Sequence, residues 1–157
     1  MPKPGPPSRR DGFPPAAVLV PIVGEESLLL TRRTSNLSRH GGEICFPGGM
    51  HEPGDETLLD TALREGGEEL GVLGRQLEVL GCLPAVISRS TGIEVTPFVA
   101  VLPSSLPIRV NEKEVAEAIH VPIPDLLGRE VEIEWVAADG RVLKAWAYDY
   151  NGCRIWA

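Results

Sequence analysis

Cysteine, aromatic residues and long apolar runs are all scarce in this sequence of 157 residues. Its three cysteines are scattered and form no Cys-x-x-Cys pair, so we expect reduced thiols that pack in the interior rather than a disulfide framework. No stretch approaches the ~20 apolar residues that a membrane-spanning helix requires. The proline-rich start also lacks the apolar core of a secretion signal. These absences predict a cytoplasmic protein that has no membrane partner.

A positive net charge is also absent, because the formal net charge is −7 at pH 7. The sequence therefore provides no global field that would favour nucleic acid as a partner. An acidic protein that acts on an anionic substrate must provide its own local cations. The arginines that we expect to serve this purpose are Arg32, Arg33, Arg39 and Arg89.

The length fits a single domain that buries about two thirds of the surface of its unfolded chain. Residues 1–15 contain six prolines and two glycines and are predicted to form a flexible arm, which leaves residues 16–157 as the domain. Short apolar and alternating runs predict a mixed sheet with few helices, which is an α+β fold. The expected strands are 16–23, 27–31, 76–83, 93–102, 131–137, 141–150 and 154–156, and a short helix is expected at 112–119. The dipeptide Asn151-Gly152 predicts a type I′ turn between the last two strands.

A longer helix is predicted between residues 59 and 70, where apolar or small residues recur at helical spacing. These residues are Leu59, Ala62, Leu63, Gly66 and Leu70. The opposite side carries Glu65, Glu68 and Glu69. Each pair of like charges at these helical spacings destabilises the helix by roughly a few tenths of a kcal/mol. Gly66 and Gly67 cost about 1 kcal/mol each in a helix. A segment that breaks two local rules is a candidate functional site, and a hard divalent cation such as Mg²⁺ would relieve the crowded carboxylates.

The order Gly-Gly, five residues, an acidic residue, and then Arg-Glu-x-x-Glu-Glu-x-Gly-apolar resembles the signature of the Nudix hydrolases. The matching residues are Gly48, Gly49, Asp55, Arg64, Glu65, Glu68, Glu69, Gly71 and Val72. Eight residues separate Asp55 from Arg64, whereas the family pattern has seven; alternatively, Glu56 is the acidic residue and its spacing from the glycines is one residue too long. The extra residue falls in the loop before the helix, where an insertion costs little. The resemblance implies a Nudix-type α/β/α sandwich with a mixed sheet.

The segment before this signature resembles that of the coenzyme A diphosphatase group of the family. It contains Leu29-Leu30-Thr31-Arg32-Arg33 and ends in Phe46-Pro47-Gly48-Gly49. The second arginine of the group's pattern is displaced by one position, to Arg39. This resemblance implies hydrolysis of the diphosphate bond of coenzyme A or its derivatives, with Mg²⁺ or Mn²⁺ as cofactor. The implied products are 4′-phosphopantetheine and adenosine 3′,5′-bisphosphate.

Related coenzyme A diphosphatases continue past an Ile-Trp segment into a C-terminal helix. We expect this helix to be missing from a chain that ends at Ile155-Trp156-Ala157. The bare face that this leaves on the sandwich motivates the hypothesis that the protein forms a homodimer.

The resemblance also assigns roles to individual residues. The expected metal ligands are Glu65, Glu68 and Glu69, and Arg64 is expected to hold the rotamers of these carboxylates. The expected catalytic residues are Glu68, Glu65 and Glu114; Glu68 is the first candidate for the general base, and Glu114 or Glu112 are the alternatives. The expected substrate-binding residues are Gly48, Gly49, Arg33 and Arg39, since an arginine suits the 3′-phosphate of coenzyme A.

Two alternatives to this function stay open. The first is a Nudix enzyme that acts on ADP-ribose, dinucleotides or nucleoside triphosphates, and the displaced Arg39 favours keeping it. The second is a Nudix-like binding module without turnover. The intact set of Glu65, Glu68 and Glu69 argues against this second alternative, because a module without catalysis has no need of crowded carboxylates.

Overall fold

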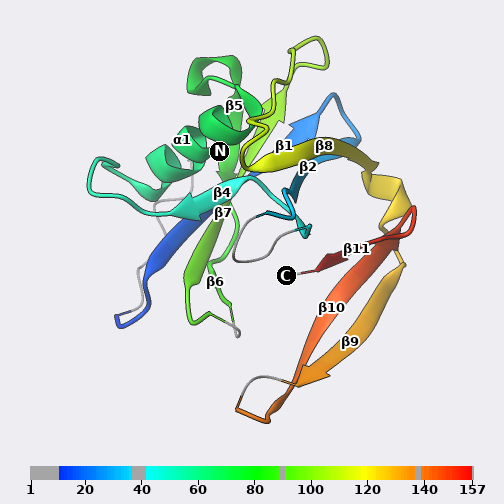
Figure 1. Cartoon of the computed structure of the whole chain (residues 1–157). Helices are drawn as coiled ribbons and strands as arrows, with labels where there is room; N and C mark the ends of the chain where they lie inside the picture. Colours follow the sequence, from blue (N-terminus) through cyan, green and yellow to red (C-terminus); the bar gives the residue numbers. More distant parts are fainter. Residues whose placement is uncertain (1–10, 37–41, 89–90, 137–138, 157) are drawn as a thin grey trace.

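The computed structural model describes residues 11–36, 42–88, 91–136 and 139–156 (Figure 1). The strands are β1 (Pro15–Val23), β2 (Ser27–Arg33), β3 (Ile44–Cys45), β4 (Gly48–Met50), β5 (Glu78–Cys82), β6 (Val86–Ile87), β7 (Glu94–Leu102), β8 (Val115–Pro122), β9 (Glu130–Val136), β10 (Val142–Tyr150) and β11 (Cys153–Trp156). The helical elements are α1 (Leu58–Leu70) and the 3₁₀ turns η1 (Gly74–Gln76) and η2 (Ile123–Asp125).

The strands form one mixed sheet. Its main path runs β5-β7-β1-β2-β3-β11-β10-β9, and β4, β6 and β8 pair with β1, β7 and β2 respectively. Strand β1 is parallel to β7 and β11 is parallel to β3, whereas β1 and β2 form an antiparallel hairpin. The predicted α+β class with a mixed sheet and few helices is therefore confirmed.

Helix α1 is delimited by its caps and packs closely on β1. Thr57 accepts a hydrogen bond from the backbone N–H of Asp60, whose carboxylate accepts from the N–H of Thr57 in return. Gly71 ends the helix in the left-handed conformation, with φ 69°. A Cβ at Gly66 would lie 2.8 Å from Leu19 Cδ2. The glycine that is costly for helix propensity thus lets α1 approach the sheet.

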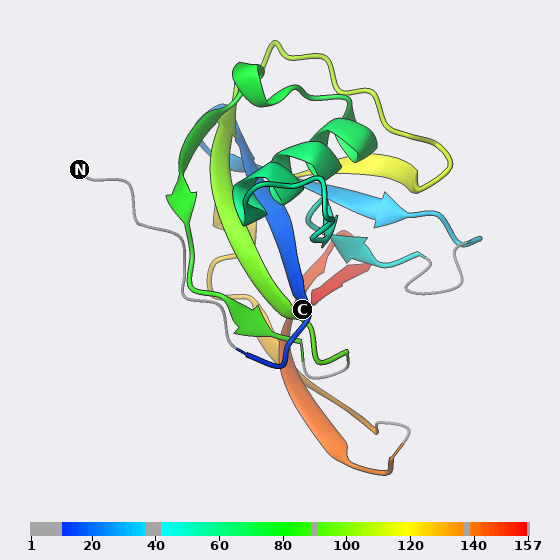
Figure 2. The ribbon, with the colours of Figure 1, turned by 90° about the vertical axis from the view of Figure 1, so that its left-hand side faces the viewer.

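The core occupies both faces of the central strands, since successive side chains of a strand point to opposite faces. Figure 2 shows α1 lying across one of these faces. The buried residues on this side are Ala17, Leu19, Leu29, Ala62, Leu70, Val72, Phe98, Ala100 and Leu102. On the opposite face, Leu30, Ile44 and Val121 form a cluster with side chains of β10 and β11. This packing fixes α1 against β1 and so positions the acidic side of the helix.

Strands β9 and β10 form a long hairpin that extends away from the rest of the molecule (Figures 1 and 2). Asn151 and Gly152, which join β10 to β11, both have positive φ (48° and 76°), as the predicted type I′ turn requires. Large apolar side chains on the hairpin, those of Val136, Val142 and Trp146, are exposed. The hairpin therefore presents apolar surface to solvent.

The prediction of a short helix at 112–119 is wrong. Residues from Val115 onward form β8, which pairs with β2 in antiparallel register, for example Leu30 with Ile119. Val115 and Val121 are buried in the core. The glutamates and alanines of this segment favour a helix locally, but pairing with a strand more than 80 residues earlier in the chain decides its structure.

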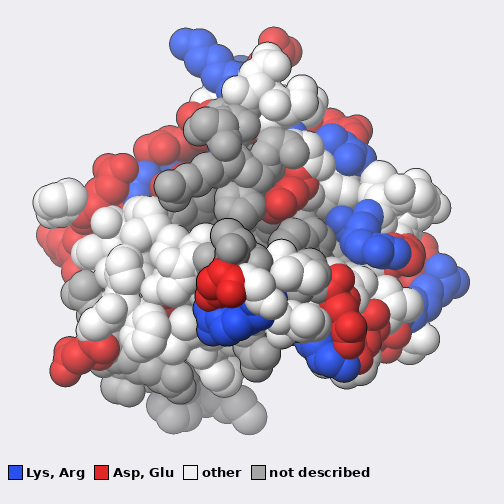
Figure 3. Space-filling view, turned by 60° about the horizontal axis from the view of Figure 1, so that its bottom comes forward, with Lys and Arg blue, Asp and Glu red and all other residues white. Residues whose placement is uncertain are grey.

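Basic side chains are separated by acidic and uncharged ones on the face that Figure 3 draws. Several charged side chains of the described residues pair with each other: Arg154 Nε donates to Asp149 Oδ1 at 2.8 Å, and Lys144 lies between Glu132 and Glu134. No helix in the described part of the chain is long and apolar enough to cross a membrane.

Candidate functional site

The two glycines of β4 bring the backbone close to both β1 and α1. Strand β4 pairs with β1, and a Cβ at Gly48 would lie 2.5 Å from the carbonyl oxygen of Ala17. A Cβ at Gly49 would overlap the carboxylate of Glu65. A side chain at position 48 would collide with the backbone of β1, and one at position 49 would displace the Glu65 carboxylate, so glycine at both positions permits this close packing.

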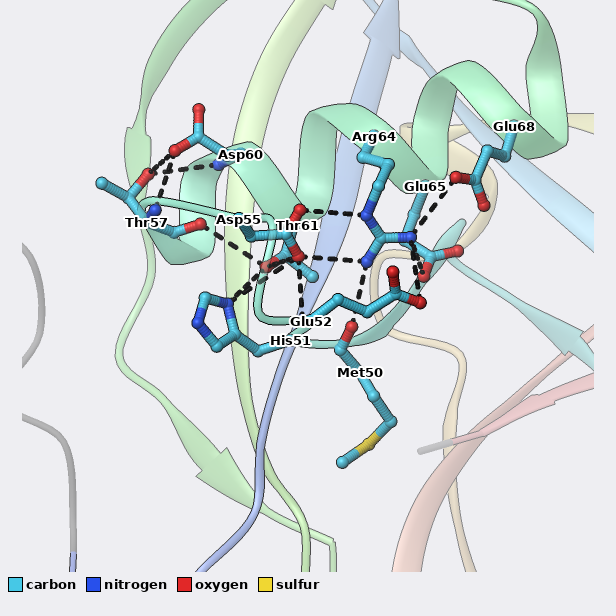
Figure 4. Close-up of polar contacts among 10 residues, drawn as sticks. All are labelled: Met50, His51, Glu52, Asp55, Thr57, Asp60, Thr61, Arg64, Glu65 and Glu68. Atoms are coloured by element: carbon cyan, nitrogen blue, oxygen red, sulfur yellow. Dashed lines mark hydrogen bonds and ion pairs between the residues drawn. The ribbon is translucent and has the colours of Figure 1, made fainter.

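Arg64 connects the loop after β4 to the glutamates of α1 (Figure 4). Its Nε donates to Asp55 Oδ1 at 3.0 Å, and its Nη2 donates to Asp55 Oδ2 at 3.1 Å and to the carbonyl of Met50 at 3.0 Å. Its Nη1 donates to Glu65 Oε1 at 3.0 Å and to Glu68 Oε1 at 3.4 Å. All three guanidinium nitrogens are thus used, as a planar fork permits. The expected pairing of Arg64 with Glu68 is present.

The structure answers the question that the sequence left open between Asp55 and Glu56. Asp55 is the loop acid that receives Arg64, and its side chain is only 5% exposed, whereas Glu56 is exposed. The hydrogen bonds from Arg64, together with the backbone N–H of Glu52 and the hydroxyl of Thr61, hold the pKa of Asp55 well below its usual range. The loop with its extra residue therefore still delivers a carboxylate to Arg64.

Glu69 is a buried carboxylate, with 2% of the residue exposed. Its hydrogen-bond donors are the backbone N–H of Gly48 and the Thr31 hydroxyl, which lies 3.4 Å from Oε2. Burial raises the pKa of Glu69 to about 7, and the charge of Glu65 adds to this rise. Burial also raises the pKa of Glu65, followed by the charges of Glu68 and Glu114. Two carboxyl groups whose pKa values are raised therefore lie close together where β4 meets α1.

Glu114 is brought to this region by a loop that binds the end of α1. The backbone N–H groups of Arg109 and Asn111 donate to the carbonyls of Leu70 (2.9 Å) and Glu69 (3.1 Å). The Asn111 side chain lies 3.4 Å from Glu114 Oε1. The charge of Glu114 acts on the pKa of both Glu65 and Glu69. Glu114, from a distant part of the sequence, is thus close enough to the signature glutamates of α1 for its charge to act on them.

Arg33 and Arg32 lie on opposite faces of β2. Arg32 donates from Nε to Glu117 Oε1 at 2.7 Å and from Nη2 to Cys153 Sγ at 2.9 Å, away from α1. Arg33 is on the α1 side, where its charge opposes the rise in the pKa of Glu69. Its Nε is buried and has no hydrogen-bond partner among the described residues. Arg33 is therefore available to an anion at this site, whereas Arg39 and Arg89 lie outside the described residues.

Glu68 is placed differently from its neighbours on α1. Its side chain is 52% exposed and turns toward Arg64. In the described part of the chain, no three His, Cys, Asp or Glu side chains are close enough together to hold a metal ion. The ligand set of Glu65, Glu68 and Glu69 remains a prediction.

Three polar residues of the site were not singled out from the sequence as functional. Thr31 contacts Glu69, Thr61 contacts Asp55, and Asn111 contacts Glu114. Thr31 belongs to the Leu-Leu-Thr segment that precedes the signature, and this position could have indicated that it lies at the site. Nothing in the local spacing of Thr61 or Asn111 indicates their contacts.

Comparison with known proteins decides the family. A model of the NUDIX domain family matches residues 13–146. A protein of Yersinia pestis (strain Pestoides F), described as an uncharacterized Nudix hydrolase NudL, is 38% identical over 147 residues, which cover 90% of this chain and 72% of that protein. The chain belongs to the Nudix family. This Nudix protein is a hydrolase that acts on diphosphate bonds, and Nudix hydrolases use divalent metal ions.

Solved structures agree on the fold of this Nudix hydrolase. An Ap4A hydrolase of C. elegans in a binary complex aligns with a TM-score of 0.59 at 23% identity, covering 70% of this chain and 81% of that one. The NUDIX domain of Shewanella oneidensis NrtR complexed with ADP ribose aligns with a TM-score of 0.54 at 21% identity, covering 74% and 77%. The Nudix-type fold predicted from the sequence is thereby confirmed, and α1 is the helix that carries its signature.

Proposed function

We propose that this Nudix hydrolase cleaves the diphosphate bond of coenzyme A or its derivatives to 4′-phosphopantetheine and adenosine 3′,5′-bisphosphate. The observation that carries the proposal is the buried Nε of Arg33, which has no hydrogen-bond partner among the described residues and lies at the end of the segment that resembles the coenzyme A diphosphatases. A phosphate at this position would accept that hydrogen bond, and arginine binds phosphate through two parallel bonds.

The donors at the site fit a hard divalent cation. Glu65, Glu68 and Glu69 offer carboxylate oxygens, which Mg²⁺ and Mn²⁺ prefer. The pKa of Glu69, about 7, reflects a buried carboxylate that lacks sufficient positive charge nearby. We propose these three glutamates as ligands of Mg²⁺ or Mn²⁺. When bound, such an ion neutralises charge on the diphosphate and lowers the pKa of an attacking water.

The remaining chemistry is assigned to residues of the chain. The glycines at positions 48 and 49 let the backbone of β4 lie directly against β1 and against the Glu65 carboxylate, which fixes this carboxylate beside β4. Arg64 fixes one carboxylate oxygen each of Glu65 and Glu68. In our proposal, Glu68 accepts the proton of the attacking water at Oε2, because Oε1 faces Arg64 and half of the side chain is open to solvent. Water then attacks one phosphorus and the bridging oxygen leaves with the other phosphate.

Glu114 is the alternative general base, because its charge reaches Glu65 and Glu69 from a distant loop. Glu112, the other alternative, is exposed. The 3′-phosphate of coenzyme A is assigned to Arg33 or Arg39.

We also propose that residues 16–157 fold as one domain behind a Pro-rich arm, and that the protein forms a homodimer. The exposed apolar side chains of Val136, Val142 and Trp146 support the homodimer, because they gather on one protruding hairpin. Light scattering that shows a monomer throughout the micromolar range would contradict the homodimer.

The function is tested by assaying coenzyme A and ADP-ribose side by side, with Mg²⁺ or Mn²⁺ and with a chelator. Metal-dependent release of adenosine 3′,5′-bisphosphate, with ADP-ribose hydrolysed much more slowly, is the expected result. Preference for ADP-ribose, a dinucleotide or a nucleoside triphosphate would keep the Nudix chemistry and reject coenzyme A. The absence of turnover with every diphosphate would favour the binding module.

A further inference from the structure

A buried hydroxyl lies between a histidine and the loop carboxylate that receives Arg64. Thr61, on α1, has 0% of its surface exposed. Its Oγ1 lies 2.8 Å from Asp55 Oδ2 and 2.9 Å from His51 Nδ1. Figure 4 shows the three side chains converging from the loop and the helix. The Nudix signature assigns no role to either His51 or Thr61.

The hydroxyl has only one proton, which determines the direction of both bonds. Asp55 is ionised and can only accept, so the proton of Thr61 is donated to Asp55 Oδ2. The oxygen of Thr61 then accepts from His51, which must carry its proton on Nδ1. With the opposite tautomer, one of the two contacts would lack a proton: either Thr61 Oγ1 and His51 Nδ1 would face each other as acceptors at 2.9 Å, or Thr61 Oγ1 and Asp55 Oδ2 would do so at 2.8 Å. The carbonyl of Thr57, at 3.5 Å from Thr61 Oγ1, is a much longer contact than Asp55 Oδ2, so the geometry favours donation from His51 to Thr61 and from Thr61 to Asp55.

The series of hydrogen bonds from His51 through Thr61 to Asp55 begins at a residue that is bonded to the sheet. The backbone N–H of His51 donates to the carbonyl of Pro15 at the start of β1, at 3.0 Å. The side chain of His51 is 26% exposed and its Nδ1 also lies 3.8 Å from Asp55 Oδ2. The exposed loop residues between them, at 52–54, are thereby bridged by side chains as well as by the backbone. Asp55 is held from the sheet through His51 and from the helix through Thr61.

This series of hydrogen bonds ends at the signature glutamates of α1. With Oδ2 fixed by Thr61, the Asp55 carboxylate presents Oδ1 to Arg64 Nε at 3.0 Å. The opposite edge of the same guanidinium donates to Glu65 Oε1 at 3.0 Å. A rotation of the Asp55 carboxylate would move the guanidinium and with it the oxygens of Glu65, because the rigid Arg64 fork donates to both carboxylates.

We propose that His51 and Thr61 are positioning residues of this hydrolase, which hold the Asp55 carboxylate so that Arg64 orients Glu65. The proposal rests on the proposed role of Glu65 but not on the identity of the substrate. Neither residue touches the reacting atoms, so both act on the chemical step more than on substrate binding.

The first test needs no substrate. Long-range ¹H–¹⁵N spectra of the whole protein at about pH 8, where an ordinary imidazole is neutral, report the tautomer of each of the three histidines. The His51 signal is assigned by its loss in His51→Asn. The Nδ1–H tautomer is expected, together with an Arg64 Nε–H signal that exchanges slowly with water. The Nε2–H tautomer at His51 would overturn the proposal, whatever the substrate proves to be.

The second test uses matched variants and the diphosphate that the wild-type protein hydrolyses best. Thr61→Val keeps the shape and removes the hydroxyl, and it is expected to lower kcat about 10- to 100-fold with little change in KM. Thr61→Ser, which keeps the hydroxyl, should stay within about threefold of the wild type. Equal losses in both variants, or a change confined to KM, would contradict a positioning role.

His51 gives an independent pair if Thr61→Val does not fold. His51→Asn retains an N–H at the position of Nδ1, whereas His51→Leu does not. Rescue of kcat by Asn but not by Leu is expected, and identical behaviour of the two would overturn the proposal. In an Asp55→Asn background, Thr61→Val should add less than about a twofold further loss, because both act on the same carboxylate. Losses that multiply would show that Thr61 acts by another route.

Discussion

Arg64 and Asp55 are joined by two hydrogen bonds, of 3.0 Å from Nε to Oδ1 and 3.1 Å from Nη2 to Oδ2. This fork crosses from α1 to the loop after β4 and leaves the Nη1 edge of Arg64 for Glu65. The Asp55 side chain is one carbon shorter than that of Glu56, the alternative loop acid. The loop between Asp55 and Arg64 is one residue longer than in the family pattern. This two-bond contact, together with the hydrogen bond from Thr61, holds α1 to the loop.

We expect Arg64→Lys to lower kcat about 10- to 100-fold, because lysine keeps the charge but cannot hold Asp55 and Glu65 at once. The matched control is Arg154→Lys, since Arg154 of β11 makes a similar fork to Asp149 of β10 at the exposed surface, at 2.8 and 3.0 Å. The control should stay within about twofold of the wild type, as exposed ion pairs contribute little. Steady-state kinetics of both variants check the prediction, and equal losses would contradict it.

Gly49→Ala is expected to abolish most activity, because its Cβ would overlap the Glu65 carboxylate and displace it from Arg64. Gly54→Ala is the control in the same loop. No atom lies within 4 Å of the Cβ that it would add, and alanine restricts the unfolded chain, so a stability gain of up to about 1 kcal/mol is expected. Assays and denaturant unfolding of the two variants separate the effects. Activity of Gly49→Ala close to that of Gly54→Ala would show that Glu65 tolerates displacement.

The sequence predicts α1 well because the information is local. Apolar residues at helical spacing from Leu59 to Leu70 specify both the helix and the face that it buries, and the observed helix differs by one residue. Strand β8 was predicted as a helix because its strand character comes from pairing with β2, which no local window contains. The hairpin turn at Asn151-Gly152 was predictable, since positive φ at two successive residues has few sequence solutions.

The site divides in the same way. The glutamates of α1 follow from their spacing, but the spacing could not decide between Asp55 and Glu56, because the conformation of the loop determines which carboxylate reaches Arg64. Glu114 was inferred from the family resemblance rather than from its surroundings. Glu114 lies near the signature glutamates because the backbone N–H groups of Arg109 and Asn111 are hydrogen-bonded to the end of α1. Backbone hydrogen bonds of this kind do not depend on the type of residue, so the sequence does not indicate them.

Glu69→Gln is expected to reduce turnover by orders of magnitude and to change the pH dependence of stability. The folded-state pKa of Glu69, about 7, lies above its ordinary value of 4.5, so the folded protein binds more protons than the unfolded chain between these values. In chelator, the free energy of unfolding of the wild type should therefore fall as pH rises from about 4.5 to about 7, by roughly 3 kcal/mol at most, and then level off.

Glu69→Gln should lose most of this slope, because glutamine is neutral throughout, and the raised pKa of Glu65 should account for what is left. Denaturant unfolding at several pH values measures it, and Glu25→Gln, at an exposed position of the β1–β2 turn, is the control that keeps the wild-type slope. Adding Mn²⁺ should stabilise the wild type and not Glu69→Gln. An active Glu69→Gln protein with normal metal dependence would refute the assignment of Glu69 as a metal ligand.

Arg33 and Arg32 offer a comparison within one strand. Arg33→Ala is expected to raise KM for coenzyme A about 10-fold or more, because an arginine contact to phosphate is a charge-assisted bidentate bond. Arg32→Ala breaks the contacts to Glu117 and Cys153 on the opposite face of β2, and it should alter stability with little effect on KM. Assaying both variants with coenzyme A and with its dephospho form, which lacks the 3′-phosphate, locates the contact. If the penalty of Arg33→Ala disappears with dephospho-coenzyme A, Arg33 binds the 3′-phosphate; if it persists, Arg33 binds the diphosphate; and an unchanged KM for both substrates rejects Arg33 as a ligand.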